Sequence, residues 1–265
     1  MNNHEIDYKL HGDDMQFVEI ELDPGETVVA EAGSLMMMED DITMETIFGD
    51  GSSSFDSGIM GKIMGAGKRM LTGESLFMTT FTNAGKEKKH VYFASPYPGK
   101  IIPIDLSEYS GKIICQKEAF LAAAKGVSVG IEFQRKLGTG FFGGEGFIMQ
   151  KLEGDGLAFI HAGGTIHRKE LQPGEVLRVD TGCLVAMTSD VNYNIEMVKG
   201  VKTALFGGEG LFFATLRGPG TVWIQSLPFS RLASRVFAAA PQTLGRGSKD
   251  EGSIAGGIFD LLGGK

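Results

Sequence analysis

Short stretches in which apolar and polar residues alternate, separated by turn residues, run along most of the chain. Near the N-terminus, apolar Val18, Ile20 and Leu22 alternate with Glu19 and Glu21, which is the period of a strand with one buried face. The motif Leu-x-Pro-Gly-Glu that begins at Leu22 favours a type II turn, because Pro fixes φ and Gly supplies a positive φ. Turn signals recur about every 8–12 residues, which is typical of a β-sandwich or barrel.

Several motifs occur more than once at a fixed spacing. Phe-Gly-Gly-Glu-Gly at 142–146 returns at 206–210, and Leu-x-Pro-Gly-Glu at 22–26 returns at 171–175. Leu-Thr-Gly-Glu at 71–74 stands where the other copies have Phe-Gly-Gly-Glu. A fixed spacing of this kind is the signature of a repeated structural unit. The sequence therefore predicts three copies of one unit, at about 15–95, 100–162 and 165–227.

These patterns predict an all-β fold of three repeated β-sandwich or double-stranded β-helix-like modules about a pseudo-threefold axis. Gly-x-Gly at 154–156 and 218–220 lies between apolar runs, as a hairpin turn would. In 228–239 apolar residues recur at i, i+3, i+4, i+7 and i+8, which predicts a short C-terminal helix. We expect a single body over residues 1–240 and a flexible, Gly- and Ser-rich tail over 241–265.

Composition excludes several classes of protein. The chain has 265 residues, of which 39 are Gly, 42% are hydrophobic and 22% are charged, which argues against disorder. A net charge of −8 argues against nucleic-acid binding, which needs a basic face. Two cysteines, Cys115 and Cys183, do not form a disulfide framework, and the polar N-terminus has no secretory pattern. We therefore expect a cytoplasmic protein.

Taken together, a set of motifs resembles one widespread family. The motifs are Ala-Gly-Gly-Thr-Ile-His-Arg at 162–168, Leu-x-Pro-Gly-Glu at 171–175, Val-Asp-Thr-Gly-Cys-Leu-Val-Ala at 179–186, Leu-Pro-Phe-Ser-Arg-Leu at 227–232 and both Phe-Gly-Gly-Glu-Gly segments. Over roughly residues 5–240 the chain resembles the uncharacterised family that includes a mitochondrial protein named for altered inheritance of mitochondria.

The resemblance implies a fold like that of the tryptophan RNA-binding attenuation protein, with three repeats in one chain. It implies no catalytic residues and no cofactor, because the family has no established catalytic activity. The mitochondrial members are linked to inner-membrane organisation, whereas this sequence shows no targeting segment at its start. The RNA-binding role of the fold's namesake does not transfer with the fold.

One glutamate recurs at the same position in each copy of the repeat, as Glu74, Glu145 and Glu209. One interpretation is that each carboxylate accepts backbone N–H groups in its Gly-rich turn. The alternative is that the three acids converge on the repeat axis and hold a cation. His161 and His167 also suggest metal ligands, but they occur in one copy only and their spacing is not the tight His-x-His of cupins, so no metal site is predicted from them.

The segment 49–70 lengthens the first copy by about 16 residues relative to the others. It is rich in Gly and Met and carries three cations. A flexible loop is one interpretation, and an adaptable contact surface for a protein, or a contact with a membrane surface, are the others. The residues that would make such a contact are Ile59, Met60, Lys62, Ile63, Met64, Lys68 and Arg69.

No nucleophile–base pair or metal cluster stands out, so the leading hypothesis is a non-enzymatic interaction or scaffold protein that binds a protein partner or itself. Two alternatives remain open. One is a small-molecule-binding module, or an unrecognised enzyme, with a pocket between repeats. The other is a peripheral membrane protein that binds through the insertion and the apolar segment 254–262.

Overall fold

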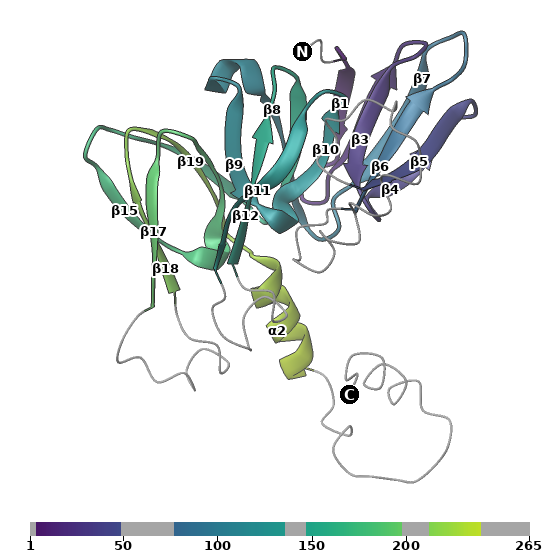
Figure 1. The fold of residues 1–265 in the computed structure, drawn as a ribbon. Helices are drawn as coiled ribbons and strands as arrows, with labels where there is room; N and C mark the ends of the chain where they lie inside the picture. The colour runs from purple at the N-terminus through teal and green to yellow at the C-terminus, as the bar shows by residue number, and fades with distance from the viewer. Residues whose placement is uncertain (1–3, 49–76, 136–146, 198–211, 240–265) are drawn as a thin grey trace, which may run out of the picture. The chain divides into compact units, whose positions relative to one another are not determined.

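The computed structural model describes residues 4–48, 77–135, 147–197 and 212–239 (Figure 1). The chain divides into two compact units, Met1–Ser230 and Arg231–Lys265. The first unit is built of β-strands, and the helix α2 (Phe229–Ala239) begins at its end. A predominantly β fold with one short C-terminal helix is therefore confirmed. No helix within the described ranges is long and apolar enough to cross a membrane.

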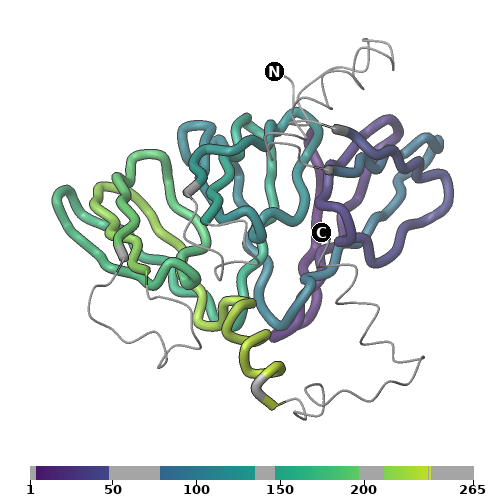
Figure 2. Tube along the Cα trace, turned by 60° about the horizontal axis from the view of Figure 1, so that its bottom comes forward, coloured from purple at the N-terminus to yellow at the C-terminus, as the bar shows by residue number. Residues whose placement is uncertain are grey.

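After β1 (Asp7–His11), the strands fall into three groups of six that follow one another along the chain. Each group occupies its own range of colour in Figure 2, because it comes from one continuous stretch of sequence. The first group is β2 (Phe17–Leu22), β3 (Thr27–Glu31), β4 (Leu35–Met38), β5 (Ile42–Phe48), β6 (Phe77–Asn83) and β7 (Lys89–Ala94).

The other two groups have the same number of strands. The second is β8 (Gly99–Asp105), β9 (Lys112–Gln116), β10 (Phe120–Ala124), β11 (Ser128–Arg135), β12 (Phe147–Glu153) and β13 (Leu157–Gly163). The third is β14 (Ile166–Leu171), β15 (Val176–Asp180), β16 (Leu184–Thr188), β17 (Asn192–Met197), β18 (Phe212–Arg217) and β19 (Gly220–Gln225).

The strands of every group pair in the same order. The first, sixth and third strands lie side by side in one sheet, and the fourth, fifth and second lie side by side in another. In the first group these sets are β2-β7-β4 and β5-β6-β3; in the second they are β8-β13-β10 and β11-β12-β9; in the third they are β14-β19-β16 and β17-β18-β15.

Neighbouring groups are joined by continuous sheets. The second strand of one group pairs antiparallel with the third strand of the next, as β3 with β10 and β9 with β16. These two junctions produce six-stranded sheets with the orders β5-β6-β3-β10-β13-β8 and β11-β12-β9-β16-β19-β14. The remaining sheets are shorter: β1-β2-β7-β4 has four strands and β15-β18-β17 has three.

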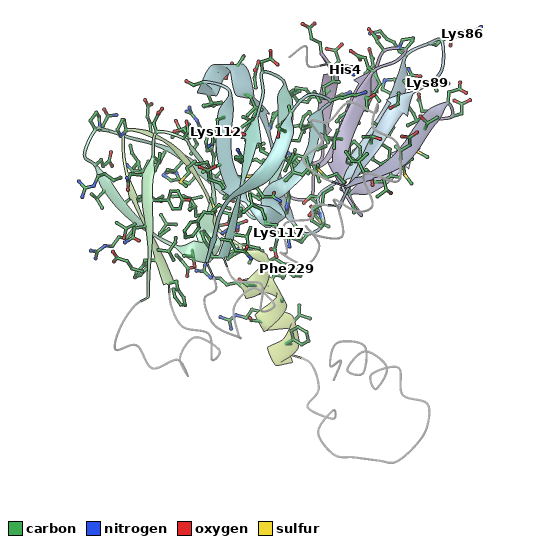
Figure 3. The ribbon with its side chains drawn as sticks, viewed as in Figure 1. His4, Lys86, Lys89, Lys112, Lys117 and Phe229 are labelled. Atoms are coloured by element: carbon green, nitrogen blue, oxygen red, sulfur yellow. The ribbon has the colours of Figure 1, made fainter. Side chains whose placement is uncertain are left out.

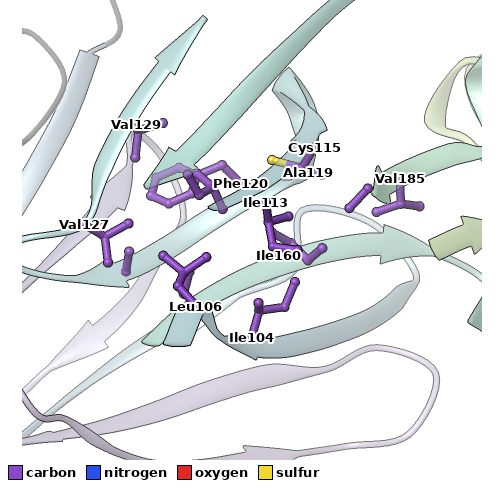
Figure 4. Close-up of a cluster of buried hydrophobic side chains, with 14 of the residues drawn as sticks. Ile104, Leu106, Ile113, Cys115, Ala119, Phe120, Val127, Val129, Ile160 and Val185 are labelled. Carbon is purple, nitrogen blue, oxygen red and sulfur yellow. The ribbon is translucent and has the colours of Figure 1, made fainter. Parts of the chain in front are cut away.

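Three clusters of buried apolar side chains fill the space between successive sheets. One of them, shown in Figure 4, includes Ile104, Ile113, Phe120 and Ile160 from both six-stranded sheets. Side chains alternate between clusters along a strand, because successive residues point to opposite faces. In β9, for example, Ile113 belongs to the central cluster and the next residue, Ile114, to the cluster of the third group. Central strands of the six-stranded sheets, such as β10 and β16, are thus buried on both faces, which explains their apolar runs.

The two Gly-x-Gly segments do not form the expected hairpin turns. Strands β12 and β13 flank residues 154–156 but lie in different six-stranded sheets, and β18 and β19 flank the second segment and also lie in different sheets. The glycines therefore take the chain across a sandwich from one sheet to the other. Sequence alternation shows that two strands are adjacent in the chain, but it carries no information on whether they share a ladder of hydrogen bonds.

The Leu-x-Pro-Gly-Glu turns behave as the sequence predicts. Gly25 and Gly174 both have positive φ, at 87° and 80°. In each turn the glutamate carboxylate accepts a hydrogen bond from a backbone N–H three residues earlier, Glu26 from Asp23 at 2.8 Å and Glu175 from Gln172 at 2.9 Å. The two turns thus repeat each other in detail.

Candidate functional site

The strand β4 has one edge without a strand partner in the described part of the chain. Its counterparts β10 and β16 are each paired on both sides, whereas β4 pairs with β7 alone and ends its sheet. The exposed residues along β4 are Met36, Met37 and Met38, and we refer to these three as the methionine edge. An exposed strand edge that lacks charged side chains is a template for pairing with another strand.

The exposed fraction of Met36 shows which surface of β4 a neighbouring group of strands would bury. All three third strands have a bulge at the same position, at Met36 in β4, Leu121 in β10 and Val185 in β16. Leu121 and Val185 are each 1% exposed and lie in the apolar cluster of the preceding group, whereas Met36 is 49% exposed. In the described residues no group of strands precedes the first one, so its bulge stays uncovered.

The adjacent position repeats this relationship. Met37 corresponds by register to Ala122 and Ala186, which are fully buried, yet Met37 is 46% exposed. Met37 pairs with Tyr92, just as the two alanines pair with an aromatic residue on the sixth strand of their own group. Those aromatic residues, Phe159 and Trp223, are buried in the preceding cluster, whereas Tyr92 is only half-buried.

The strand β15 is the complementary open edge at the other end of the array. Its counterparts β3 and β9 pair with the next group, whereas β15 pairs with β18 alone and ends its sheet in the described residues. Val176 is 45% exposed, and Arg178 is also exposed. By register Arg178 takes the place of Val29 and Ile114, which are buried in the cluster of the following group.

A second candidate site is a group of titratable side chains near the junction of the first two groups, in which His161 is buried and Tyr97 and Glu31 are half-buried. The ring of Tyr97 contacts both His161 and Phe229, with centroid distances of 4.3 Å and 5.2 Å. His161 is 2% exposed, and within the described residues neither ring nitrogen has a partner of good hydrogen-bond geometry. Burial lowers the pKa of His161 to about 4, an effect that the backbone of Tyr97 partly offsets, so its imidazole is neutral at pH 7.

Glu31, at the end of β3, belongs to the same neighbourhood. Burial raises the pKa of Glu31 to about 7, the negative charge of Glu118 adds to the increase, and Lys117 opposes it. The pKa of Tyr97 is raised by burial and by the charges of Glu118 and Glu31. Figure 3 labels two residues of this neighbourhood, Lys117 and Phe229. Perturbed groups gathered in this way are typical of functional sites, although structural clusters show them too.

The site residues predicted from the sequence lie outside the described residues, so those predictions stay untested. This holds for the three repeated glutamates Glu74, Glu145 and Glu209. It also holds for the contact residues of the insertion, Ile59, Met60, Lys62, Ile63, Met64, Lys68 and Arg69.

The two histidines are in different environments. His161 is in the core on β13, whereas His167 is exposed on β14. Within the described ranges, no group of three or more His, Cys, Asp or Glu side chains is arranged to hold a metal ion.

Sequence reasoning missed the methionine edge. The repeat spacing already aligned Leu35 with Leu184 and Met38 with Met187, which places Met37 opposite a small residue in the other copies. The sequence does not reveal that the third strand of a group pairs with the second strand of the preceding group. Once that pairing is known, an apolar third strand in the first copy stands out as a strand without a neighbour.

Comparisons with known proteins agree on one family. A family model described as Mitochondrial biogenesis AIM24 matches residues 8–227. An uncharacterized protein of Streptococcus pyogenes is 32% identical over 233 residues, which covers 86% of this chain and 88% of the relative. A crystal structure of a Streptococcus pyogenes protein, determined by a structural genomics consortium, is 25% identical with a TM-score of 0.68, covering 89% of this chain and all of the other.

Proposed function

The chain belongs to the Mitochondrial biogenesis AIM24 family, and on that premise we propose that it is a non-enzymatic interaction or scaffold protein. The single observation that carries the proposal is the exposure of the methionine edge. Met36 and Met37 are about half exposed, whereas the residues at the same positions of the other two groups are buried by a neighbouring group. Methionine packs against surfaces of varied shape, so such an edge favours contact with another protein.

The proposal has further parts that go beyond what the described residues show. We propose that the three groups of six strands are three copies of one module, which the recurring strand order supports. The pseudo-threefold axis, the likeness to the tryptophan RNA-binding attenuation protein and the cytoplasmic location remain predictions from the sequence. A second protein contact at residues 49–70 is also a prediction from the sequence. The same holds for peripheral membrane contact through that segment and the apolar segment 254–262.

The proposal is tested by recovering partners from the source cell. Tagged wild-type protein is cross-linked, purified and analysed by mass spectrometry beside a Met37→Lys/Met38→Lys variant. The control is Met44→Lys, which changes a methionine of similar exposure on β5. We expect a partner, either another protein or a second copy of this chain, that the wild type and the control retain and the edge variant loses. If all three recover the same proteins, the methionine edge is not a contact surface.

A second candidate function, a small-molecule-binding module, is favoured by His161. Its two ring nitrogens are buried without a partner of good hydrogen-bond geometry in the described residues, and a ligand with a polar group would satisfy them. Thermal-shift screening of a metabolite library against the wild type and His161→Leu tests this function, because a ligand that binds the native state raises its melting temperature. A compound that stabilises only the wild type supports it, and a screen without any such compound contradicts it.

A further inference from the structure

We propose that the partner of the methionine edge is a second copy of this chain, bound head to tail through its strand β15. This inference rests on the proposed function, because it names the occupant of the same surface. The two shorter sheets have complementary open edges: a second strand, β15, at one end and a third strand, β4, at the other. At both internal junctions, these are the two strand positions that pair.

Joining two copies would complete the sheets that each copy leaves short. The order β17-β18-β15, followed by β4-β7-β2 of the second copy, repeats the strand positions of both six-stranded sheets. The first and fourth strands of a group, by contrast, never join one group to the next in the described residues. The pairing therefore extends an interface that the chain already forms twice within itself.

The internal junctions also fix the register of the pairing. Ala122 lies opposite Ala30 at the first junction, and Ala186 lies opposite Cys115 at the second. The corresponding pair between two copies is Met37 opposite Val179. Since the strands are antiparallel, Met38 then lies opposite Arg178 and Glu39 lies opposite Leu177.

The side chains at the two edges are suited to this pairing. Leu177 of β15 packs against the cluster of the third group, and Met36 and Met37 correspond to residues that enter the cluster of the preceding group. Val176 adds exposed apolar surface on the opposite face of β15, beside Arg178. Arg178 is the exception, because its counterparts are apolar. In the proposed register it faces Met38, two residues before Asp40, whose carboxylate pairs with Lys89 of its own chain and is still 83% exposed. The charge of Arg178 then favours the acidic turn after β4 of the other copy.

An interface of this kind is heterologous: each copy uses one edge to bind and offers the other edge to a further copy. It therefore predicts rings or chains of copies rather than a closed two-fold dimer. The molar mass of the wild type, measured by light scattering during size-exclusion chromatography, should rise with concentration or exceed that of one chain. The Met37→Lys/Met38→Lys variant should elute as a single chain, and the Met44→Lys control should elute as the wild type does.

Disulfide trapping tests which edges meet. Two proteins are prepared in a Cys183→Ser background, one with Met38→Cys and the other with Arg178→Cys; the native Cys115 is fully buried. Residues directly opposite on paired strands have Cβ atoms close enough to bridge. Mild oxidation of the mixture should give a covalent dimer, and each protein alone should give none. A mixture of Met44→Cys with Arg178→Cys, the matched control, should give none either.

The outcomes separate this inference from the proposed function. Self-association with a trapped 38–178 dimer supports both. A wild type that stays a single chain at every concentration overturns the head-to-tail pairing, and a covalent dimer of the Met38→Cys protein alone overturns it in favour of a two-fold contact. In either case the proposed function still stands if the edge variant loses a partner in the source cell.

Discussion

The side chain of Gln116 donates a hydrogen bond to the backbone carbonyl of Thr181 at an N–O distance of 2.6 Å. Gln116 ends β9, and Thr181 begins the short helix η4 (Thr181–Cys183) in the next group of strands. Both residues are buried, so the bond supports the junction between the second and third groups where water has no access.

We expect Gln116→Ala to destabilise the protein by about 1–3 kcal/mol, because the substitution leaves a buried carbonyl without its donor. The measurement is the free energy of unfolding in urea. Gln172→Ala is the control, since Gln172 is exposed in a turn, and it should change stability by less than about 0.5 kcal/mol. Equal effects of the two substitutions would show that the bond to Thr181 contributes little.

The position of Gln116 in the first group is occupied by Glu31, whose carboxyl pKa is raised to about 7 by burial and by the nearby negative charge of Glu118, against the effect of Lys117. Ionising Glu31 is therefore less favourable in the folded chain than in the unfolded chain, where the pKa is near 4.5. The stabilising contribution is complete below pH 4.5 and is lost as the pH rises through 7. The difference in pKa corresponds to at most about 3 kcal/mol.

Glu31→Gln should remove this dependence, because Gln keeps the shape of the protonated acid and cannot ionise. We expect the variant to be more stable than the wild type at pH 8 and similar at pH 5, as measured by urea unfolding at several pH values. Glu108→Gln, which changes an exposed glutamate, should leave the pH dependence as in the wild type. A Glu31→Gln curve parallel to that of the wild type would contradict the prediction.

Much of the β-structure could be predicted because its signals are local. Alternation in the segment that became β2, positive φ at Gly25 and helical spacing from Phe229 all depend on residues close together in the chain. The spacing of the repeated motifs predicts three units, and that the three groups of six strands are copies of one module stays a proposal. The sheets themselves were harder to predict, because pairing between strands depends on contacts that are distant in sequence.

At the candidate site, too, the features that depend on contacts distant in sequence could not be predicted. The exposure of Met36 cannot be recognised from the sequence. Leu121 and Val185, at the same position of the other third strands, are equally apolar and are buried. The difference arises because no group precedes the first in the described residues, and this depends on how the groups follow one another rather than on any local pattern. The buried state of His161 likewise depends on Tyr97, which is distant in sequence and which no local pattern connects to it.

His161 should make the protein sensitive to mild acid. Burial lowers its pKa to about 4 from 6.5, so the unfolded chain binds a proton more readily than the folded chain between these values. Stability is then lost as the pH falls from 6.5 toward 4, by at most about 3 kcal/mol. His161→Leu should reduce the difference in unfolding free energy between pH 7 and pH 4.5.

The control for this prediction is His167→Gln, because His167 is exposed on β14. It should retain the acid sensitivity of the wild type. If His161→Leu is as sensitive to acid as the wild type, other groups are responsible, and the neutral imidazole of His161 has no part in it.

Gly99, at the start of β8, should tolerate substitution far less than Gly25, which lies in the turn between β2 and β3. A Cβ at Gly99 would overlap the backbone carbonyl of Ala162 on the paired strand β13, and backbone on both sides cannot move apart without breaking the ladder. We expect Gly99→Ala to cost about 3 kcal/mol or more, in the range of severe overpacking. Gly25 has a φ of 87° with no atom within 4 Å of an added Cβ, so Gly25→Ala should cost only about 1–2 kcal/mol from backbone strain. Urea unfolding of the two variants measures both losses of stability. A Gly25→Ala variant less stable than Gly99→Ala would refute the steric explanation for Gly99 in the pairing of β8 with β13.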